Sequence, residues 1–313
     1  MTLSPEQLRA FHRDGVLVVE DVVPAALRAR VEAEYAARLA ELCAAWGVAP
    51  RGDVFATLRA VHAAGHDWFQ PLDISLPGGP IAPDTPFHAG PAVFDLVTAP
   101  EILDVVESLI GPEITSNPIQ HLRIKPPAAE LRADEARAHV TVTSWHQDRG
   151  VAHAEADATD IVTVWVAMTD ADRENGCLVA QPFAPGAAQR MLPHCPMAQT
   201  AIPDAFLEPA RRVDLPVRAG GVVLLHPMVP HASRPNASPD RCRWSFDLRY
   251  NRTGQPTGRA HFPDFVARSR RAPETALRDW EAWRGLWLDA RARAAGLPHV
   301  PIHRWTGDSP HCA

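Results

Sequence analysis

The chain has 313 residues, 46% of them hydrophobic and 22% charged, with a formal net charge of −6. That balance is ordinary for a globular protein, and it excludes the global basic field expected of a nucleic-acid or anionic-membrane binder. No apolar run approaches the roughly 18 residues of a membrane-spanning helix and no signal pattern opens the chain, so we expect a cytoplasmic protein.

The length favours one elaborated domain over two. The cysteines are odd in number, widely spaced and without a C-x-x-C pair, which argues against a disulfide framework and against a zinc–cysteine site. We therefore expect all five to be reduced packing residues: Cys43, Cys177, Cys195, Cys242 and Cys312.

The N-terminal part reads as helical. Ser4-Pro5-Glu6-Gln7 is a helix start with Ser4 as N-cap, and the helix should run to about His12. A strand is predicted over 16–19. Apolar residues then recur at helical spacing from 25 to 42.

A Pro- and Gly-rich loop is predicted over 70–92, and loops of such length are usually functional or mobile. A helix over 99–110 and a strand over 119–125 should follow. Residues 128–143 are polar and charged, as in a lid or an exposed insertion.

The middle of the chain is rich in β-branched residues. Strands are predicted at 161–168, 220–226 and 243–250, each bounded by Gly, Pro, Asn or Asp. Near the C-terminus, Leu277, Trp280, Trp283 and Trp287 have the spacing of an amphipathic helix, for which packing is the favoured role.

Two His-x-Asp triplets occur, and their local structures distinguish them. His12 and Asp14 lie at a predicted helix end, where residues two apart point in nearly opposite directions. His146 and Asp148 lie in a segment predicted to be extended, where residues two apart leave the same face. Only the second pair can bind one metal ion.

A third ligand must come from elsewhere in the β-rich core, and "HPMVPHASRPN" offers His226 and His231. Two imidazoles and one carboxylate with open positions are the ligands of non-haem Fe(II) oxygenases, although zinc hydrolases use the same types. Arg243 and Ser245 share a strand face downstream, and such a guanidinium with a hydroxyl suits the distal carboxylate of 2-oxoglutarate.

Seven separated motifs follow one another along the chain: "FHRDGVLVVEDVV", "RIKPP", "WHQD", "VTVWVAMTD", "ENGCL", "GGVVLLHPMVPHASRPN" and "DRCRWSFDLRY". Together they resemble the motifs of one family, the phytanoyl-CoA dioxygenases, which are Fe(II)/2-oxoglutarate oxygenases. The resemblance implies a mainly β fold with flanking helices, built on a double-stranded β-helix (cupin-like jelly-roll) core. We expect a single domain over 1–313, with helical support at about 1–115, the core at about 116–255 and a helical tail at about 256–313.

The resemblance also implies roles for individual residues. His146, Asp148 and His231 would be the catalytic iron ligands, with His231 preferred over His226. Arg243 would hold 2-oxoglutarate. By motif, the rest of the cosubstrate pocket would include Ser233, Trp165, Gln147, His121 and Ser245, although strand alternation should turn the side chain of Gln147 away from the metal.

The implied activity is oxidation of a small organic substrate by Fe(II), 2-oxoglutarate and O2, through hydroxylation or desaturation with release of succinate and CO2. The chain departs from the family at 128–143 and at "VAQPFAPGAAQR" (179–190), so the family's acyl-CoA substrates are not carried over.

A zinc-dependent hydrolase on the same triad and a non-catalytic jelly-roll binding protein remain alternatives. Substrate and oligomeric state stay open.

Overall fold

The computed structural model describes residues 2–312 and is built around two antiparallel sheets. The large sheet has the strand order β1-β6-β3-β8-β2-β9 and the small sheet the order β5-β4-β7. The strands are β1 (Val16–Val19), β2 (Ile114–Lys125), β3 (Ile161–Ala167), β4 (Leu178–Ala180), β5 (Val213–Leu215), β6 (Val222–Leu225), β7 (His231–Ser233), β8 (Arg243–Arg252) and β9 (Phe265–Arg268). This helix-flanked β core is the predicted fold class.

The two faces of the large sheet differ in chemistry because successive side chains of a strand alternate between faces. On β8, Trp244, Phe246 and Leu248 join the main hydrophobic core with the helices. Their neighbours Arg243 and Asp247 lie on the opposite face, toward the small sheet. The helix-covered face therefore stabilises the fold, and the other face is free to carry polar chemistry.

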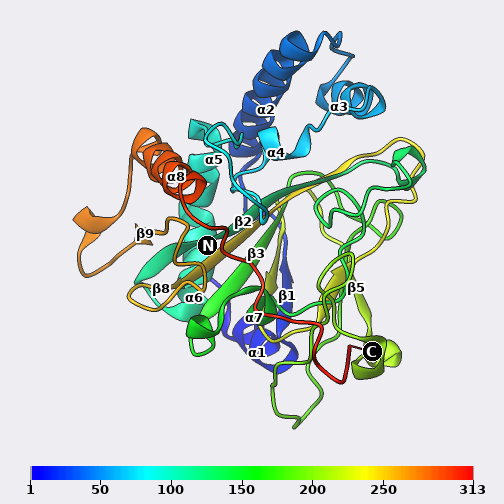
Figure 1. Ribbon diagram of the computed structural model, residues 1–313. Helices are drawn as coiled ribbons and strands as arrows, with labels where there is room; N and C mark the ends of the chain where they lie inside the picture. The colour runs from blue at the N-terminus through cyan, green and yellow to red at the C-terminus, as the bar shows by residue number, and fades with distance from the viewer. Residues whose placement is uncertain (1, 313) are drawn as a thin grey trace.

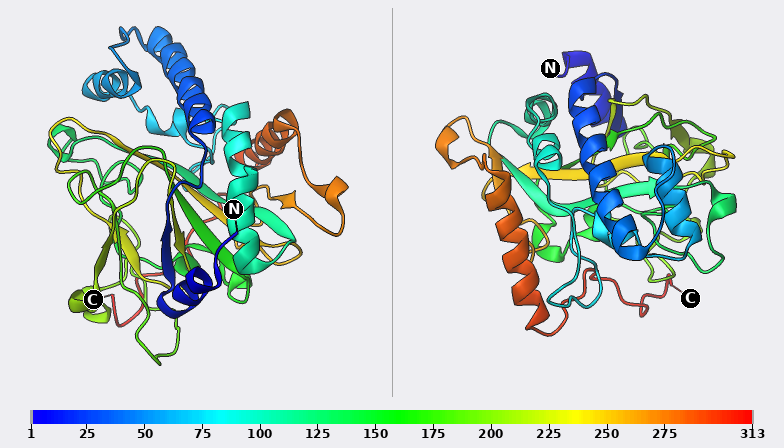
Figure 2. Two further views of the ribbon diagram at one scale, coloured as in Figure 1. Left: turned by 180° about the vertical axis from the view of Figure 1, so that it is seen from behind. Right: turned by 90° about the horizontal axis from the view of Figure 1, so that it is seen from above.

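Helices cover the outer face of the large sheet (Figures 1 and 2). The helices are α1 (Pro5–Asp14), α2 (Ala25–Trp46), α3 (Val54–Ala63), α4 (Phe69–Leu72), α5 (Pro91–Val97), α6 (Pro100–Ile110), α7 (Asp148–Val151) and α8 (Trp280–Ala295). Short 3-10 turns span η1 (Ala128–Glu130), η2 (Ala154–Ala156), η3 (Asp204–Phe206), η4 (Pro209–Arg211) and η5 (Pro273–Thr275). No helix in the described part of the chain is long and apolar enough to cross a membrane.

The longer predicted elements are confirmed. Ser4 and Gln7 form the predicted capping box of α1, and Trp283 and Trp287 bury the apolar side of α8. The loop that was predicted from 70 is helical at its start, in α4, and α5 begins at its end. Between them Ile74 and Leu76 are buried, so this stretch packs into the core.

One prediction about the cysteines is wrong. Cys195 and Cys312 form a disulfide, whereas Cys43, Cys177 and Cys242 are free and buried. Sequence spacing could not reveal the pair because 117 residues separate its members. The bridge ties the C-terminal segment, red in Figure 1, to the loop that follows residue 190.

Candidate metal and cosubstrate site

His146, Asp148 and His231 lie together where the segment that leads into α7 runs beside β7. His146 forms an isolated β-bridge with His231, and their backbones exchange two hydrogen bonds of 2.9 Å. Asp148 is the first residue of α7, so the prediction that it lies in an extended segment is wrong. The turn nevertheless points its carboxylate at both imidazoles, with Nε2 of His146 and His231 at 3.7 and 3.9 Å from its oxygens.

The three side chains each offer one ligand atom, and these atoms lie within 4.8 Å of one another. Among the described residues this is the only group of three or more His, Cys, Asp or Glu side chains with such geometry. His12 and Asp14 take no part: Asp14 pairs with Arg13 at the protein surface. His226 is also outside the group, since its Nδ1 accepts a hydrogen bond from the Met228 amide.

Hydrogen bonds orient each of the three side chains. Nδ1 of His146 donates to the Ser144 carbonyl at 2.8 Å, and Nδ1 of His231 donates to the Val229 carbonyl at 3.1 Å. A carbonyl can only accept, so Nδ1 carries a proton in both rings, and Nε2 is the nitrogen left to act as a metal ligand. Such a backbone partner for the distal nitrogen is typical of metal-binding histidines.

Two further side chains fix the carboxylate. Arg249 donates to Oδ1 of Asp148, and Thr163 donates to Oδ2 at 2.6 Å. Burial alone would raise the pKa of Asp148, but Arg249 and the neighbouring imidazoles outweigh it and hold the pKa below its ordinary value. Burial, assisted by His231, lowers the pKa of His146 well below its ordinary value. The pair is thus an ionised carboxylate beside a neutral imidazole, the protonation states that metal binding requires.

Arg243 lies fully buried near this cluster without a carboxylate partner among the described residues. Its Nη1 donates to Ser245 at 2.7 Å, its guanidinium stacks 5.1 Å from the centre of the Trp165 ring, and its Nε and Nη2 have no hydrogen-bond partner. Burial and the charge of Arg123 lower its pKa to about 9. An unpaired buried cation costs free energy, which a bound anion would recover.

Ser233 and Lys125 adjoin Arg243, since Lys125 on β2 is the register partner of Arg243 on β8. The ammonium group of Lys125 is buried and donates to the hydroxyls of Ser233 and Thr143, at 2.5 and 3.1 Å. Desolvation and the positive charge of Arg243 lower its pKa well below the ordinary value. Two basic side chains therefore converge here, and a bound anion would favour the charged form of both, which is a second sign that an anion belongs in this place.

The remaining predicted site residues lie around this centre. The side chain of Gln147 turns away from the metal cluster, as alternation predicted, and bonds the backbone of Arg190, Leu192 and Met228. His121 lines the same cavity as His146, with its Nδ1 paired to Asp73 at 2.9 Å. That cavity has a volume of about 270 Å³.

Several residues of the site were not identified from the sequence. Arg249 and Thr163 orient Asp148, and Lys125 and Thr143 position Ser233. Arg249 carried a usable signal, because it continues the alternate positions 243, 245 and 247 of one strand face. Lys125 belongs to the motif "RIKPP", but its place opposite Arg243 depends on strand register, which the sequence does not reveal.

A family model described as phytanoyl-CoA dioxygenase matches residues 11–243 of this chain. That interval contains all three members of the cluster and ends at Arg243.

The fold is also similar to several solved structures, among them two that are described as non-haem enzymes. The non-haem monooxygenase ThoJ is 21% identical, with a TM-score of 0.56 and coverage of 93% of this chain and 97% of ThoJ. The epimerase SnoN, solved with Fe3+, α-ketoglutarate and nogalamycin RO, is 22% identical with a TM-score of 0.51, covering 82% and 87%. HygX from Streptomyces hygroscopicus, with nickel and 2-oxoglutarate, is 14% identical with a TM-score of 0.50, covering 81% and 89%. At these identities the likeness concerns the fold.

Proposed function

The chain belongs to the phytanoyl-CoA dioxygenase family, and from this premise we propose how its residues divide the work of an Fe(II)- and 2-oxoglutarate-dependent dioxygenase. His146, Asp148 and His231 hold the iron. Arg243 pairs with the distal carboxylate of 2-oxoglutarate, assisted by Ser245 and Ser233. Trp165 and Lys125 border the same place.

The observation that carries the proposal is the unpaired guanidinium of Arg243 beside a three-ligand cluster. Two buried donors without partners are rare in folded proteins, and a carboxylate would satisfy both. The donor set of the cluster, two imidazoles and one carboxylate, fits a divalent iron ion that keeps open positions. The three-ligand cluster and the unpaired guanidinium therefore both support the proposal.

Iron, 2-oxoglutarate and O2 supply the oxidising chemistry when bound, and the protein supplies geometry and shielding. Arg249 and Thr163 keep the carboxylate of Asp148 directed at the metal position. The β-bridge holds the two histidines in register. Since the three ligands are 8% exposed or less, bulk water has little access to them.

We further propose that the substrate is a small organic molecule that binds in the cavity lined by His146 and is hydroxylated or desaturated there. Residues 136–139 and 198–200 also line this cavity, and they lie in or after the segments that depart from the family pattern. These departures support a substrate that differs from the acyl-CoA substrates of the family. The single-domain organisation over 1–313 and the cytoplasmic location are kept as predictions.

Oxygen-dependent consumption of 2-oxoglutarate tests the function without a known substrate. We expect slow release of succinate when the protein is supplied with Fe(II), 2-oxoglutarate and O2, and none when Zn(II) replaces Fe(II) or O2 is withheld. A protein that consumes 2-oxoglutarate equally well with Zn(II), or without O2, would contradict the proposal.

A further inference from the structure

The cavity beside His146 is lined by positive charge without acidic residues. Among its lining residues are the arginines Arg123, Arg137, Arg249 and Arg259, together with five histidines. None of the described residues that line it is Asp or Glu. A low-dielectric cavity of one sign of charge favours a ligand of the opposite sign.

Three of these arginines are neutralised by carboxylates outside the cavity lining. Arg123 pairs with Asp247 at 2.5 Å, Arg249 pairs with Asp148, and Arg137 pairs with Asp67 and Glu135. The fourth, Arg259, has no carboxylate partner in the part of the chain that the structure describes. Arg259 thus differs from the others by a missing counter-charge.

Arg259 is held firmly although it is unpaired. The residue is only 4% exposed. Its Nη2 donates to the Val151 carbonyl at 3.0 Å, and its Nε has no hydrogen-bond partner. The preceding Gly258 has φ +75°, and a Cβ there would lie 2.6 Å from Ala152, so the chain packs tightly against the segment after α7. The local backbone therefore fixes the guanidinium in place before any ligand arrives.

His303 adds a second unsatisfied group to the same cavity. It lies in the C-terminal segment, and its buried Nδ1 has no hydrogen-bond partner. Burial and the positive charge of Arg259 lower its pKa to about 4, so the imidazole is neutral and can hydrogen-bond a ligand without competing for its charge.

We infer that the substrate carries a carboxylate, and that Arg259 pairs with it while the rest of the molecule lies toward His146. This inference rests on the proposed function and names its substrate class. Arg259 is a specificity-determining residue in this view. A substrate carboxylate would supply the counter-ion that the fold does not provide for Arg259. A neutral molecule of the same shape would leave the buried guanidinium without one.

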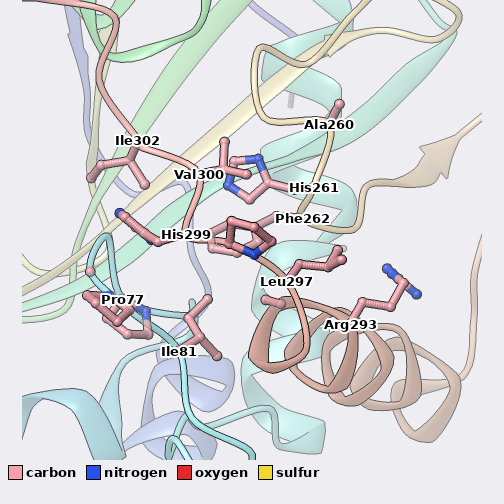
Figure 3. Close-up of a pocket in the computed structure, with 14 residues that line it drawn as sticks. Pro77, Ile81, Ala260, His261, Phe262, Arg293, Leu297, His299, Val300 and Ile302 are labelled. Atoms are coloured by element: carbon pink, nitrogen blue, oxygen red, sulfur yellow. The ribbon is translucent and has the colours of Figure 1, made fainter.

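A second cavity adjoins the first at Ile302, which lines both. It has a volume of about 290 Å³, and Figure 3 shows Pro77, Ile81 and Phe262 around it with the C-terminal segment from Leu297 to Ile302. This apolar lining suggests probes that join a carboxylate to a hydrocarbon group. Arg293, which is exposed and lines only this second cavity, provides a matched control.

The test compares acids with their neutral amides on protein loaded with Ni(II) and 2-oxoglutarate, which occupy the metal site without turnover. Propionate with propionamide and phenylacetate with phenylacetamide are titrated at constant ionic strength, and binding is followed by ligand-observed NMR. We expect at least one acid to bind tenfold or more tightly than its amide. Arg259→Gln should abolish that preference, Arg259→Lys should retain part of it, and Arg293→Gln should leave it unchanged.

Other results would overturn the inference. If neither acid binds the wild-type protein more tightly than its amide, the inference is refuted, whatever the variants show. A preference that survives Arg259→Gln, or that is lost in Arg293→Gln, would assign the recognition elsewhere. Failure to load Ni(II) and 2-oxoglutarate in the first place would contradict the proposed function, and is seen before any acid is added.

Discussion

At the scale of single residues, position within a motif matters more than residue type. His226 and His231 both belong to "HPMVPH", yet only His231 faces His146 across a β-bridge. The ring of His226 instead packs between Phe11 and Phe183. This pair of histidines therefore offers a matched test of the metal centre.

Replacing His231 by Ala should abolish stoichiometric Fe(II) binding, because two ligands that remain cannot form a three-ligand site. His226→Ala should leave Fe(II) binding unchanged, and His146→Ala should behave like His231→Ala. Anaerobic titration with Fe(II) provides the measurement. Equal losses in the His226 and His231 variants would contradict the assignment of the ligands.

Arg243 provides the corresponding test for the cosubstrate. Arg243→Leu should weaken 2-oxoglutarate binding by roughly a hundredfold, since losing one partner of a buried charge pair costs about 3 kcal/mol. Calorimetric titration of the Ni(II)-loaded protein measures this change, and Ni(II) binding itself should survive. Arg241→Leu is the control, because Arg241 pairs with Asp172 and Glu174 at the surface. An unchanged affinity in Arg243→Leu would refute the role of Arg243.

The cluster could be predicted from sequence because His and Asp are common metal ligands and the motifs that contain them were complete. Its supporting residues could not. Arg249 reaches Asp148 across 101 positions, and Lys125 reaches Ser233 across 108. Such contacts depend on how strands pair, and a shift of one residue would turn every side chain to the other face.

At the scale of elements, the long helices and strands followed their sequence patterns, whereas the small sheet did not. β4, β5 and β7 have three residues each, which is too short for a periodic pattern to be recognised. They exist because the large sheet supplies an apolar surface: Leu178 and Leu215 pack with Trp165 and Val223 in one cluster. Tertiary packing decides such short strands.

The C-terminal segment is the element that sequence described least well. Trp305 donates to the Gly150 carbonyl at 2.7 Å and stacks on His194, and Cys312 closes the disulfide with Cys195. The segment, red in Figure 1, thus lies beside α7, and its residues Ile302 and His303 line the cavity. A covalent link to the loop after residue 190 keeps it there.

Cys312→Ser should release this segment and expose it to proteases, because the variant loses the covalent link that holds the segment to Cys195. Limited proteolysis followed by mass spectrometry should show faster cleavage after residue 297 in the variant. Reductant should produce the same change in the wild-type protein and no further change in the variant. Identical cleavage patterns with and without reductant would contradict a stabilising role for the bridge.

At the scale of the whole molecule, ion pairs connect the C-terminal region to the helices that cover the sheet. Arg268 on β9 bonds Glu107 of α6 at 2.7 Å, and Arg270 bonds the same carboxylate at 2.9 Å. Burial tends to raise the pKa of Glu107, but these two arginines outweigh it and lower the pKa below its ordinary value. The ionised carboxylate is thus the form that stabilises the fold.

Glu107→Gln should lower the free energy of unfolding at pH 7 by up to about 1 kcal/mol. A carboxylate whose pKa is lowered in the folded state stabilises the fold at pH values above its unfolded pKa, about 4.3. The contribution is lost as the pH falls through the pKa of the folded state. Urea unfolding of both proteins at pH 7 and at pH 3 measures the difference, which should shrink toward zero at pH 3. A difference of the same size at both pH values would exclude the ion pairs as its cause.

The most direct test of an Fe(II)/2-oxoglutarate centre is an anaerobic titration of the apo-protein, first with Fe(II) and then with 2-oxoglutarate, followed by visible absorption. A metal-to-ligand charge-transfer band should appear only after the second addition, persist in His226→Ala and be absent in His231→Ala. A wild-type protein that binds Fe(II) yet develops no band with saturating 2-oxoglutarate would contradict the assignment of this site.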